Sequence, residues 1–247
     1  MLPAKYALSM VSSFLTLVPV VVAASSYARL MLQFPGFRSE DAQGPYALGI
    51  ADDVKVPVTL GVMSRCPDAL LCETVFDKAL SKVVDKIDLS LSFIGYLNSS
   101  DTDFGVTCLH GPGECAGNIQ QLCASTHLDV NTWWAFVKCQ NYYGRHKVGE
   151  PDIALKCADT AKFDWIESGV GRCAGEDASG KGEEGIQLLR ESVKRTDELG
   201  IEKSCTILIN NKPVCVHDGT WKECEDGHTP EDFVRQINAE YDRLNIA

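Results

Sequence analysis

VPVTLGVMSRCPDALLC, residues 56–72, decides the fold of this chain. Residues 56–63 form a short continuous apolar run, which is typical of a strand buried on both faces of a parallel sheet. A helical pattern follows from Pro67 to about residue 84, and a proline suits the first turn of a helix because its missing N–H would have no partner there. The stretch therefore predicts a strand and then a helix, with Cys66 at the helix N-terminus.

The sequence on either side extends this unit. Residues 87–93 alternate apolar and polar side chains with a period of two, which predicts a second strand and so a βαβ unit. The right-handed crossover of such a unit places Cys66 at the carboxyl end of the first strand, where sites in these sheets lie. Later in the chain, the pattern predicts a helix, two strands and a last helix, at residues 183–199, 205–210, 213–217 and 229–244.

A cysteine-rich block separates the two halves. Residues 114–175 carry apolar side chains at helical spacing, including the stretch LDVNTWWAFVKCQNYY. Without this block, the element order is β-α-β followed by α-β-β-α, which is the order of a thioredoxin-like fold. We therefore predict one α/β domain over residues 55–247, with a disulfide-rich helical insertion at about 108–180.

Composition limits the class of protein. The 247 residues are 45% hydrophobic, which is enough to build a sizeable core, and the formal net charge is -11. A protein that binds nucleic acid or an anionic membrane needs a basic surface, and no long basic cluster is present. We expect no nucleic-acid partner.

The N-terminus predicts entry into the secretory pathway. Residues 1–28 hold one lysine before an almost uncharged apolar stretch, which predicts a secretory signal peptide, with an uncleaved signal anchor as the alternative. Residues 29–54 have no clear period and are interpreted as a tether. Eleven cysteines behind such a leader predict an oxidising compartment and a disulfide framework, and Asn98 begins a glycosylation sequon. Membrane association is expected only if the leader stays uncleaved.

The segment CLHGPGECAGNIQQLC, residues 108–123, resembles the signature of the gamma-interferon-inducible lysosomal thiol reductase family. That signature reads Cys-x-His-Gly-x-x-Glu-Cys, followed by an Asn and a further Cys. Residues 207–214, ILINNKPV, are similar to the family's strand before its Asn-x-Lys-Pro turn. The seven signature positions are Cys108, His110, Gly111, Glu114, Cys115, Asn118 and Cys123.

The resemblance implies a secreted, lysosomal or vacuolar enzyme that reduces protein disulfides with a Cys-x-x-Cys pair at the first helix. This sequence departs from that pattern at Ala69, which stands where the second, resolving cysteine belongs. It departs again at Cys205, which falls about where thioredoxin-like proteins carry a cis-proline beside the active disulfide. The chain is therefore interpreted as a single-cysteine branch of the family.

Cys66 is the candidate nucleophile. The helix N-terminus favours a thiolate, Arg65 helps and Asp68 opposes, and a thiolate that attacks a disulfide forms a mixed disulfide. Release of this intermediate would need an external thiol such as glutathione, or a distant cysteine, for which Cys205 is the candidate. The alternative is that Cys66 is held permanently in a bridge, although Cys72 lies too far along the helix to be its partner.

The other cysteines are interpreted as structural. Cys215 and Cys224 flank a turn and predict a hairpin bridge, whereas Cys205 has the alternatives of a bond to Cys72 or to either of these two. Three bridges are predicted to clamp the insertion, with the pairing left open, and a zinc site that uses His110 is the weaker alternative. The six cysteines concerned are Cys108, Cys115, Cys123, Cys139, Cys157 and Cys173.

Three functional hypotheses follow. The first is a thiol-disulfide oxidoreductase that acts on protein disulfides through Cys66 and uses no metal or organic cofactor. The second is a redox-inactive binding or structural protein on a thioredoxin-like frame, which the alanine at position 69 favours. The third is a lipid-binding, saposin-like role for the cysteine-rich helices, which leaves the flanking βαβ and ββα units without a role.

Overall fold

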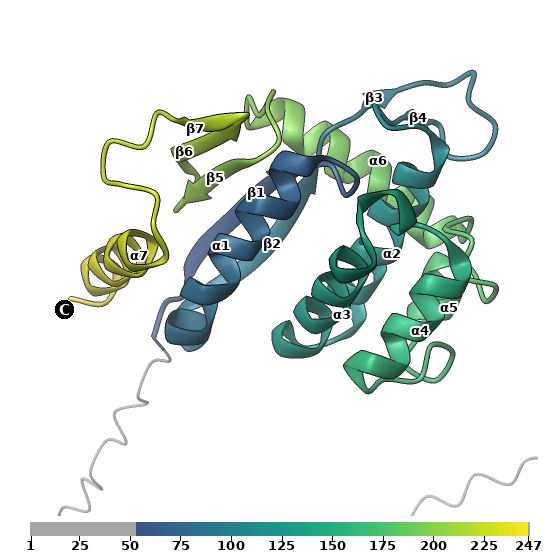
Figure 1. Cartoon of the computed structure of the whole chain (residues 1–247), viewed down its shortest axis with the longest axis horizontal. Coiled ribbons are helices and arrows are strands. Elements are labelled where there is room, and N and C mark those ends of the chain that lie inside the picture. Colours follow the sequence, from purple (N-terminus) through teal and green to yellow (C-terminus); the bar gives the residue numbers. More distant parts are fainter. Residues whose placement is uncertain (1–52, 247) are drawn as a thin grey trace, which may run out of the picture. The chain divides into compact units, whose positions relative to one another are not determined.

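The computed structural model describes residues 53–246 (Figure 1). The signal peptide or anchor expected at residues 1–28, and almost all of the expected tether, lie outside the described residues. Seven helices and seven strands are found in the described part, in the order β1 (Val56–Val62), α1 (Pro67–Val83), β2 (Ile87–Phe93), β3 (Tyr96–Leu97), β4 (Val106–Thr107), α2 (Pro112–His127), α3 (Val130–Tyr143), α4 (Pro151–Ala161), α5 (Val170–Ala174), α6 (Glu183–Glu198), β5 (Thr206–Ile209), β6 (Lys212–Asp218), β7 (Thr220–Lys222) and α7 (Pro230–Asn245).

Five of the strands form a mixed sheet in the order β2-β1-β5-β6-β7. Strands β1 and β2 are parallel, with Val56 opposite Ile87 and Val62 opposite Phe93, so the predicted βαβ unit is confirmed. Strand β5 runs antiparallel to β1 on its other side and pairs with β6. Strand β1 is therefore an interior strand with a neighbour on each side, and the loop at its carboxyl end leads to Cys66.

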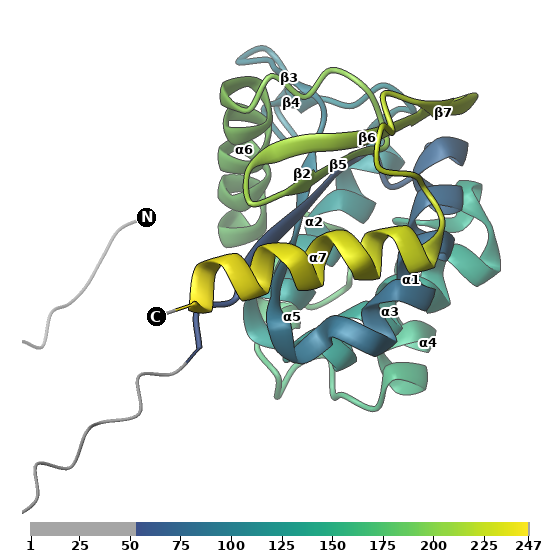
Figure 2. The ribbon, with the colours of Figure 1, turned by 90° about the vertical axis from the view of Figure 1, so that its left-hand side faces the viewer.

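Helices cover both faces of the sheet (Figure 2). On one face α1 packs against α7, where the rings of Phe76 and Phe233 lie 6.1 Å apart. On the other face α6 packs against β2, and Ser92 is hydrogen-bonded to Thr196. A Cβ atom at Gly61 would overlap the side chain of Ile201, so the approach of the segment after α6 to the sheet requires glycine at this position.

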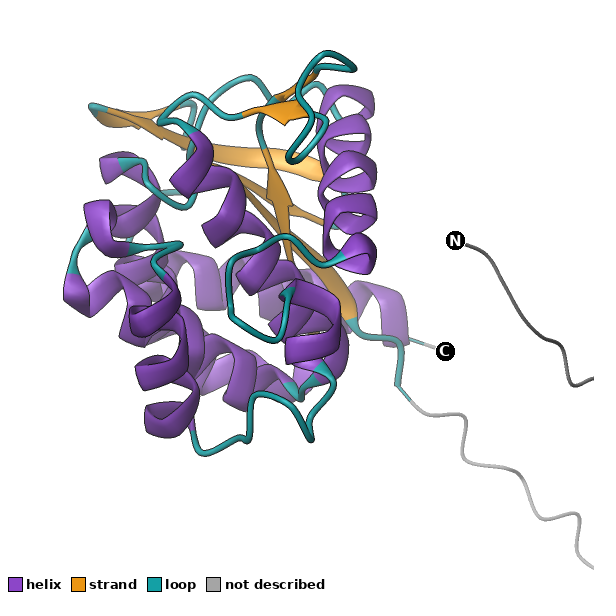
Figure 3. Cartoon of the chain, turned by 90° about the vertical axis from the view of Figure 1, so that its right-hand side faces the viewer, coloured by secondary structure: helices purple, strands orange, loops and turns teal. Residues whose placement is uncertain are grey.

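Helices α2 to α5 form the predicted insertion and are grouped together in Figure 1, and Figure 3 distinguishes the helices of the chain from its strands by colour. Disulfides join Cys123 to Cys173 and Cys139 to Cys157, and a third bridge, Cys108–Cys115, closes the turn that precedes α2. The three predicted insertion bridges are confirmed, and the hairpin bridge Cys215–Cys224 is confirmed as well.

Aromatic side chains of α3 divide between core and surface. Trp133, Trp134 and Phe136 are buried in the insertion core, whereas Tyr142 and Tyr143 are exposed. Within the described residues, none of the helices combines the length and the apolar character needed to cross a bilayer. The insertion thus packs most of its aromatic surface internally.

Candidate active site

Cys66 is the N-cap residue of α1, immediately after the loop that leaves β1. Its backbone is extended, with φ -78° and ψ 132°, its N–H donates to the Met63 carbonyl at 2.9 Å, and Pro67 opens the helix. All eleven cysteines lie in the described residues, and Cys66 is the one that is in no disulfide. Its side chain is buried, with 6% of its surface exposed. A free thiol therefore stands at the helix N-terminus, just below the surface.

The sulfur of Cys66 has two polar neighbours. It lies 3.8 Å from the Ser204 carbonyl oxygen and 3.9 Å from Oδ2 of Asp68. The other oxygen of this carboxylate accepts from the Gly219 amide at 2.9 Å and lies 2.7 Å from Nδ1 of His217. The carboxylate beside the thiol thus accepts a backbone hydrogen bond and lies close to a buried imidazole nitrogen that has no hydrogen-bond partner among the described residues.

Arg65 points away from this sulfur, toward the insertion. Its Nε donates to the Val148 carbonyl at 2.8 Å, and its own carbonyl accepts from Arg145 at 3.2 Å. Burial lowers the pKa of the Arg65 guanidinium, and the charges of Glu114 and Glu150 act in the opposite direction. The structure shows Arg65 as a link between the loop and the insertion rather than a direct neighbour of the thiol.

Glu114 of the signature motif binds the loop that carries Cys66. The carboxylate is fully buried, and Oε2 accepts from the Arg65 amide at 3.2 Å. The same side chain accepts from the His110 amide at 3.2 Å and contacts Nδ1 of His110 at 2.6 Å. Gly111, the N-cap of α2, has a φ of 83°, a conformation that favours glycine.

Asn118 adds a second set of contacts to the loop that carries Cys66. Its Oδ1 accepts from the Ser64 amide at 3.1 Å, its Nδ2 faces the sulfur of Cys108 at 3.8 Å, and the Ser64 hydroxyl donates to the Glu114 carbonyl at 3.3 Å. The motif residues of α2 therefore bind two consecutive residues of the loop, Ser64 and Arg65. Their position indicates that the motif fixes the backbone that presents the thiol.

Cys205 lies beside the thiol but is bonded elsewhere. The Ser204–Cys205 peptide bond is cis, and the Ser204 hydroxyl accepts from the Met63 amide at 3.0 Å. The sulfur of Cys205 is joined to that of Cys72, with the two Cα atoms 6.2 Å apart. Of the sequence alternatives, the structure places Cys205 in the bridge to Cys72, and no Cys66–Cys205 bond is formed. Ala69 is fully buried.

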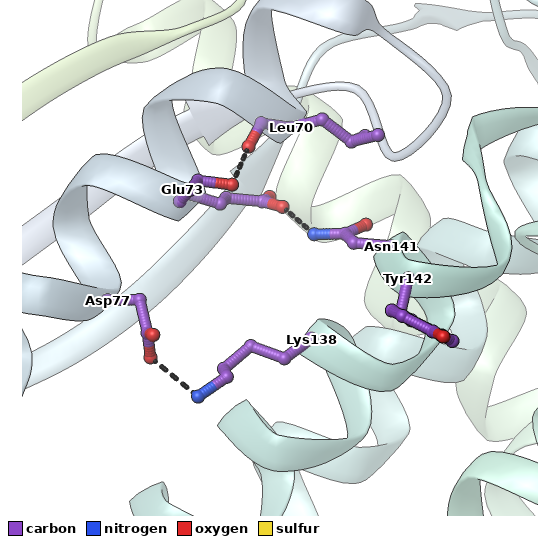
Figure 4. A pocket seen from close by; sticks show the side chains of 7 residues that line it. Leu70, Glu73, Asp77, Lys138, Asn141 and Tyr142 are labelled. Atoms are coloured by element: carbon purple, nitrogen blue, oxygen red, sulfur yellow. Dashed lines mark hydrogen bonds and ion pairs between the residues drawn. The ribbon is translucent and has the colours of Figure 1, made fainter.

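A pocket of about 270 Å³ opens between α1 and α3 next to this site (Figure 4). Glu73 is 3% exposed and accepts from Asn141, while Asp77 at the mouth of the pocket pairs with Lys138 at 3.0 Å. Burial raises the pKa of Glu73 to about 7, and the hydrogen bond from Asn141 opposes the shift. One oxygen of Glu73 and the amide oxygen of Asn141 have no hydrogen-bond partner.

Sequence reasoning missed several residues that shape the site. Ser64, Ser204 and His217 contact the loop or the carboxylate next to the thiol, and Glu73 lies buried about two turns farther along α1. For His217 the sequence held one signal, the predicted pair of strands β5 and β6. This pairing places His217 opposite Cys205, where the amide of each residue donates to the carbonyl of the other at 2.9 and 2.8 Å. The sequon residue Asn98 lies partly exposed after β3, where its Nδ2 donates to Thr107.

Comparison with known proteins finds similarity to a family of thiol reductases. Residues 57–161 match the family described as gamma interferon inducible lysosomal thiol reductase (GILT). GILT-like protein 1 of Drosophila melanogaster is 25% identical over 64% of this chain and 67% of its own length. A gamma-interferon-inducible lysosomal thiol reductase-like protein of Anopheles gambiae is 29% identical over 62% of this chain and 66% of its own length.

Among solved structures, the fold resembles that of MdbA, a thiol-disulfide oxidoreductase from Corynebacterium diphtheriae. The TM-score is 0.50 at 16% identity, over 77% of this chain and 86% of MdbA. At this identity the likeness speaks for the fold alone, and it supports the predicted thioredoxin-like architecture with a helical insertion.

Proposed function

We propose that this chain is a member of the gamma-interferon-inducible lysosomal thiol reductase family and a thiol-disulfide oxidoreductase that acts on protein disulfides through Cys66. One observation carries the proposal: Cys66 is unpaired while the ten other cysteines are bonded, and it occupies the helix N-terminus at the carboxyl end of the interior strand β1. Thiol-disulfide exchange needs a thiolate at a position of this kind.

The proposed reaction begins when the Cys66 thiolate attacks one sulfur of a substrate disulfide. A Cys66–substrate disulfide forms and the other substrate sulfur leaves as a thiolate. Because Ala69 carries no sulfur, a thiol outside the local motif must release the second half of the substrate. Glutathione or another small thiol is one source of that group, and a distant cysteine of the chain is the other.

The proposed compartment is a secretory or lysosomal lumen. Five disulfides in one domain suit an oxidising compartment. Residues 1–28 would direct the chain there as a signal peptide, and Asn98, on a loop, would carry a glycan. Disulfide-containing proteins are the proposed substrates.

An insulin-reduction assay tests the proposal. Wild-type protein and the Cys66→Ser variant are compared with glutathione as the reductant, after differential alkylation has verified which cysteines are free. We expect wild type to accelerate reduction and Cys66→Ser to fall to the background rate. Equal rates for the two proteins, with the wild type at background, would support the redox-inactive binding protein, which the absence of a second cysteine at position 69 favours.

A further inference from the structure

The relation between the free thiol and the nearest disulfide points to a route for the electrons. Cys66 is 6% exposed, whereas Cys72 and Cys205 are both fully buried in the same core. A small thiol in solution therefore reaches Cys66 more readily than it reaches either sulfur of the disulfide. Any native exchange at the buried bond has its shortest access through Cys66.

Backbone geometry places Cys205 within reach of Cys66. The Cys66 sulfur is 3.8 Å from the Ser204 oxygen, and three bonds, C=O, C–N and N–Cα, join that oxygen to the Cα of Cys205. The Cα of Cys205 therefore lies within about 8 Å of the sulfur even with those bonds in line, and closer along their true bent path. The Ser204 hydroxyl also binds the Met63 amide, so the two segments are held together.

Cys72 cannot take the place of Cys205 in this contact. It lies six residues after Cys66, with α1 beginning at Pro67, which puts it about 9 Å farther along the helix axis. That separation exceeds the roughly 7 Å over which two Cα atoms can share a disulfide. The residue before Cys205 contacts the Cys66 sulfur, and Cys205 itself is bonded to Cys72. Cys205 therefore lies between the free thiol and Cys72.

We propose that Cys66, Cys205 and Cys72 form a thiol relay, in which Cys205 resolves the Cys66 mixed disulfide and Cys72 then closes the bond seen in the structure. The proposal rests on the thiol-disulfide function proposed above. It assigns to Cys205 and Cys72 the two electrons that a Cys-x-x-Cys enzyme holds in its local pair. The structure is then the oxidised, product state of the relay.

The steps balance as follows. The Cys66 thiolate bonds one substrate sulfur and expels the first substrate thiolate. The Cys205 thiolate attacks the Cys66 sulfur, which forms Cys66–Cys205 and releases the second substrate thiolate. The Cys72 thiolate attacks Cys205, which forms Cys72–Cys205 and frees Cys66. Cys72 and Cys205 have lost two electrons and two protons, and the substrate disulfide has gained them.

Regeneration runs through the same contact in reverse. The Cys66 thiolate attacks Cys205 of the buried disulfide, which gives Cys66–Cys205 and a Cys72 thiolate. A small thiol such as glutathione then attacks the Cys66 sulfur, which forms a Cys66–glutathione disulfide and releases the Cys205 thiolate. A second glutathione attacks the glutathione sulfur of that disulfide and releases the Cys66 thiolate. Two glutathione molecules end as oxidised glutathione, and the relay is again fully reduced.

The first test measures whether Cys66 is the entry point. Folded wild type and Cys66→Ser are incubated with excess glutathione, quenched by alkylation and read by fragment-ion mass spectrometry. Tryptic peptide 66–78 contains both Cys66 and Cys72, and cleavage before Pro67 distinguishes them. We expect reduction of Cys72–Cys205 to slow by about 10-fold or more in Cys66→Ser. The Cys139–Cys157 bridge serves as the internal control and should react equally in both.

A second variant tests the predicted intermediate. In Cys72→Ser the relay cannot close its last bond, so mild treatment with oxidised glutathione should trap a Cys66–Cys205 disulfide. Where a serine variant does not fold, wild type with Cys66 alkylated in the native state replaces it in the first test. Equal reduction rates with and without a reactive Cys66, or the absence of the trapped bond, would overturn the relay.

The outcomes separate the relay from the proposed function. If Cys66→Ser abolishes insulin reduction but Cys72–Cys205 stays intact in every wild-type sample, the enzyme stands and the relay fails. If the buried bond exchanges through Cys66 but wild type does not reduce insulin, the internal exchange stands and the proposed function fails.

Discussion

Glu114 joins three parts of the site with a single side chain. It accepts from the Arg65 amide and the His110 amide and contacts the His110 ring, all from a fully buried position. Replacing it with an amide keeps the shape but turns an acceptor into a donor that faces other donors. A buried donor left unpaired costs about 1–3 kcal/mol.

Glu114→Gln is therefore expected to lower the free energy of unfolding by that amount, measured by urea titration. It should also reduce the rate at which Cys66 is alkylated or used in insulin reduction, since the loop that presents the thiol loses its fixed backbone. Glu167→Gln, at an exposed position, is the control and should change neither quantity. A Glu114→Gln protein as stable and as reactive as wild type would contradict the role given to the motif.

Individual residues differed in how far the sequence revealed them. The position of Cys66 at a helix start, and the alanine at position 69 in place of a resolving cysteine, could both be recognised in the sequence. A helix start and a three-residue spacing are local features of the chain. The binding of Ser64 by Asn118 joins residues 54 apart in sequence, so it depends on how α2 docks beside the sheet. The bond between Cys72 and Cys205 spans 133 residues and was one of several open alternatives for the same reason.

Helix α7 shows how an element can be specified by its first turn. Thr229 accepts from the Asp232 amide while the Asp232 side chain accepts from the Thr229 amide, which makes a full capping box, and Pro230 follows the cap. The hydrogen bonds from Thr229 lower the pKa of Asp232 to about 2. The cap directs Phe233 into the contact with Phe76 of α1.

Thr229→Ala is expected to lower the free energy of unfolding by about 1 kcal/mol, because the helix loses the side-chain partner of its first amides. Urea unfolding followed by circular dichroism measures the change. Thr126→Ala, at an exposed position late in α2, is the control and is expected within about 0.5 kcal/mol of wild type. Equal losses in both variants would show that the box contributes nothing beyond helix propensity.

The longer elements outside the insertion were predictable one by one, whereas the insertion was predicted only as a helical block and the shortest strands were not predicted. The predicted strand at residues 87–93 matches β2, and the predicted start of the last helix matches α7 to within one residue. Strands β3 and β4 have two residues each and β7 has three, which is too short for a period of two to be recognised. Their pairing is set by the tertiary contacts around them.

For the whole molecule, one buried carboxyl and two half-buried ones change the free energy of unfolding in opposite directions as the pH rises. Burial raises the pKa of Glu73 to about 7 from an ordinary value of 4.5, so the native state keeps a proton that the unfolded chain releases. Stability from this group is fully present below about pH 4.5 and is lost as the pH rises to 7. The pKa values of Asp232 and Glu240 are lowered to about 2, so their contribution is lost as the pH falls toward that value.

We therefore expect the free energy of unfolding to fall between about pH 4.5 and 7, with Glu73 responsible for a decrease on the order of 3 kcal/mol. Glu73→Gln should remove most of that slope, as measured by urea unfolding at several pH values. Asp77 and Lys138, which share the pocket, form an ion pair with each other at 3.0 Å. A wild-type curve that is flat over this interval would contradict the assignment.

The five disulfides of this chain have a connectivity without crossings in sequence. Cys72–Cys205 encloses the three bridges of the insertion, Cys215–Cys224 follows it, and no pair interleaves with another. During synthesis from the N-terminus, the three insertion bridges can therefore form before Cys205, the second partner of the enclosing bond, has been made. The Cys72–Cys205 bond needs residue 205, so until that residue is available neither Cys66 nor Cys72 has a native disulfide partner.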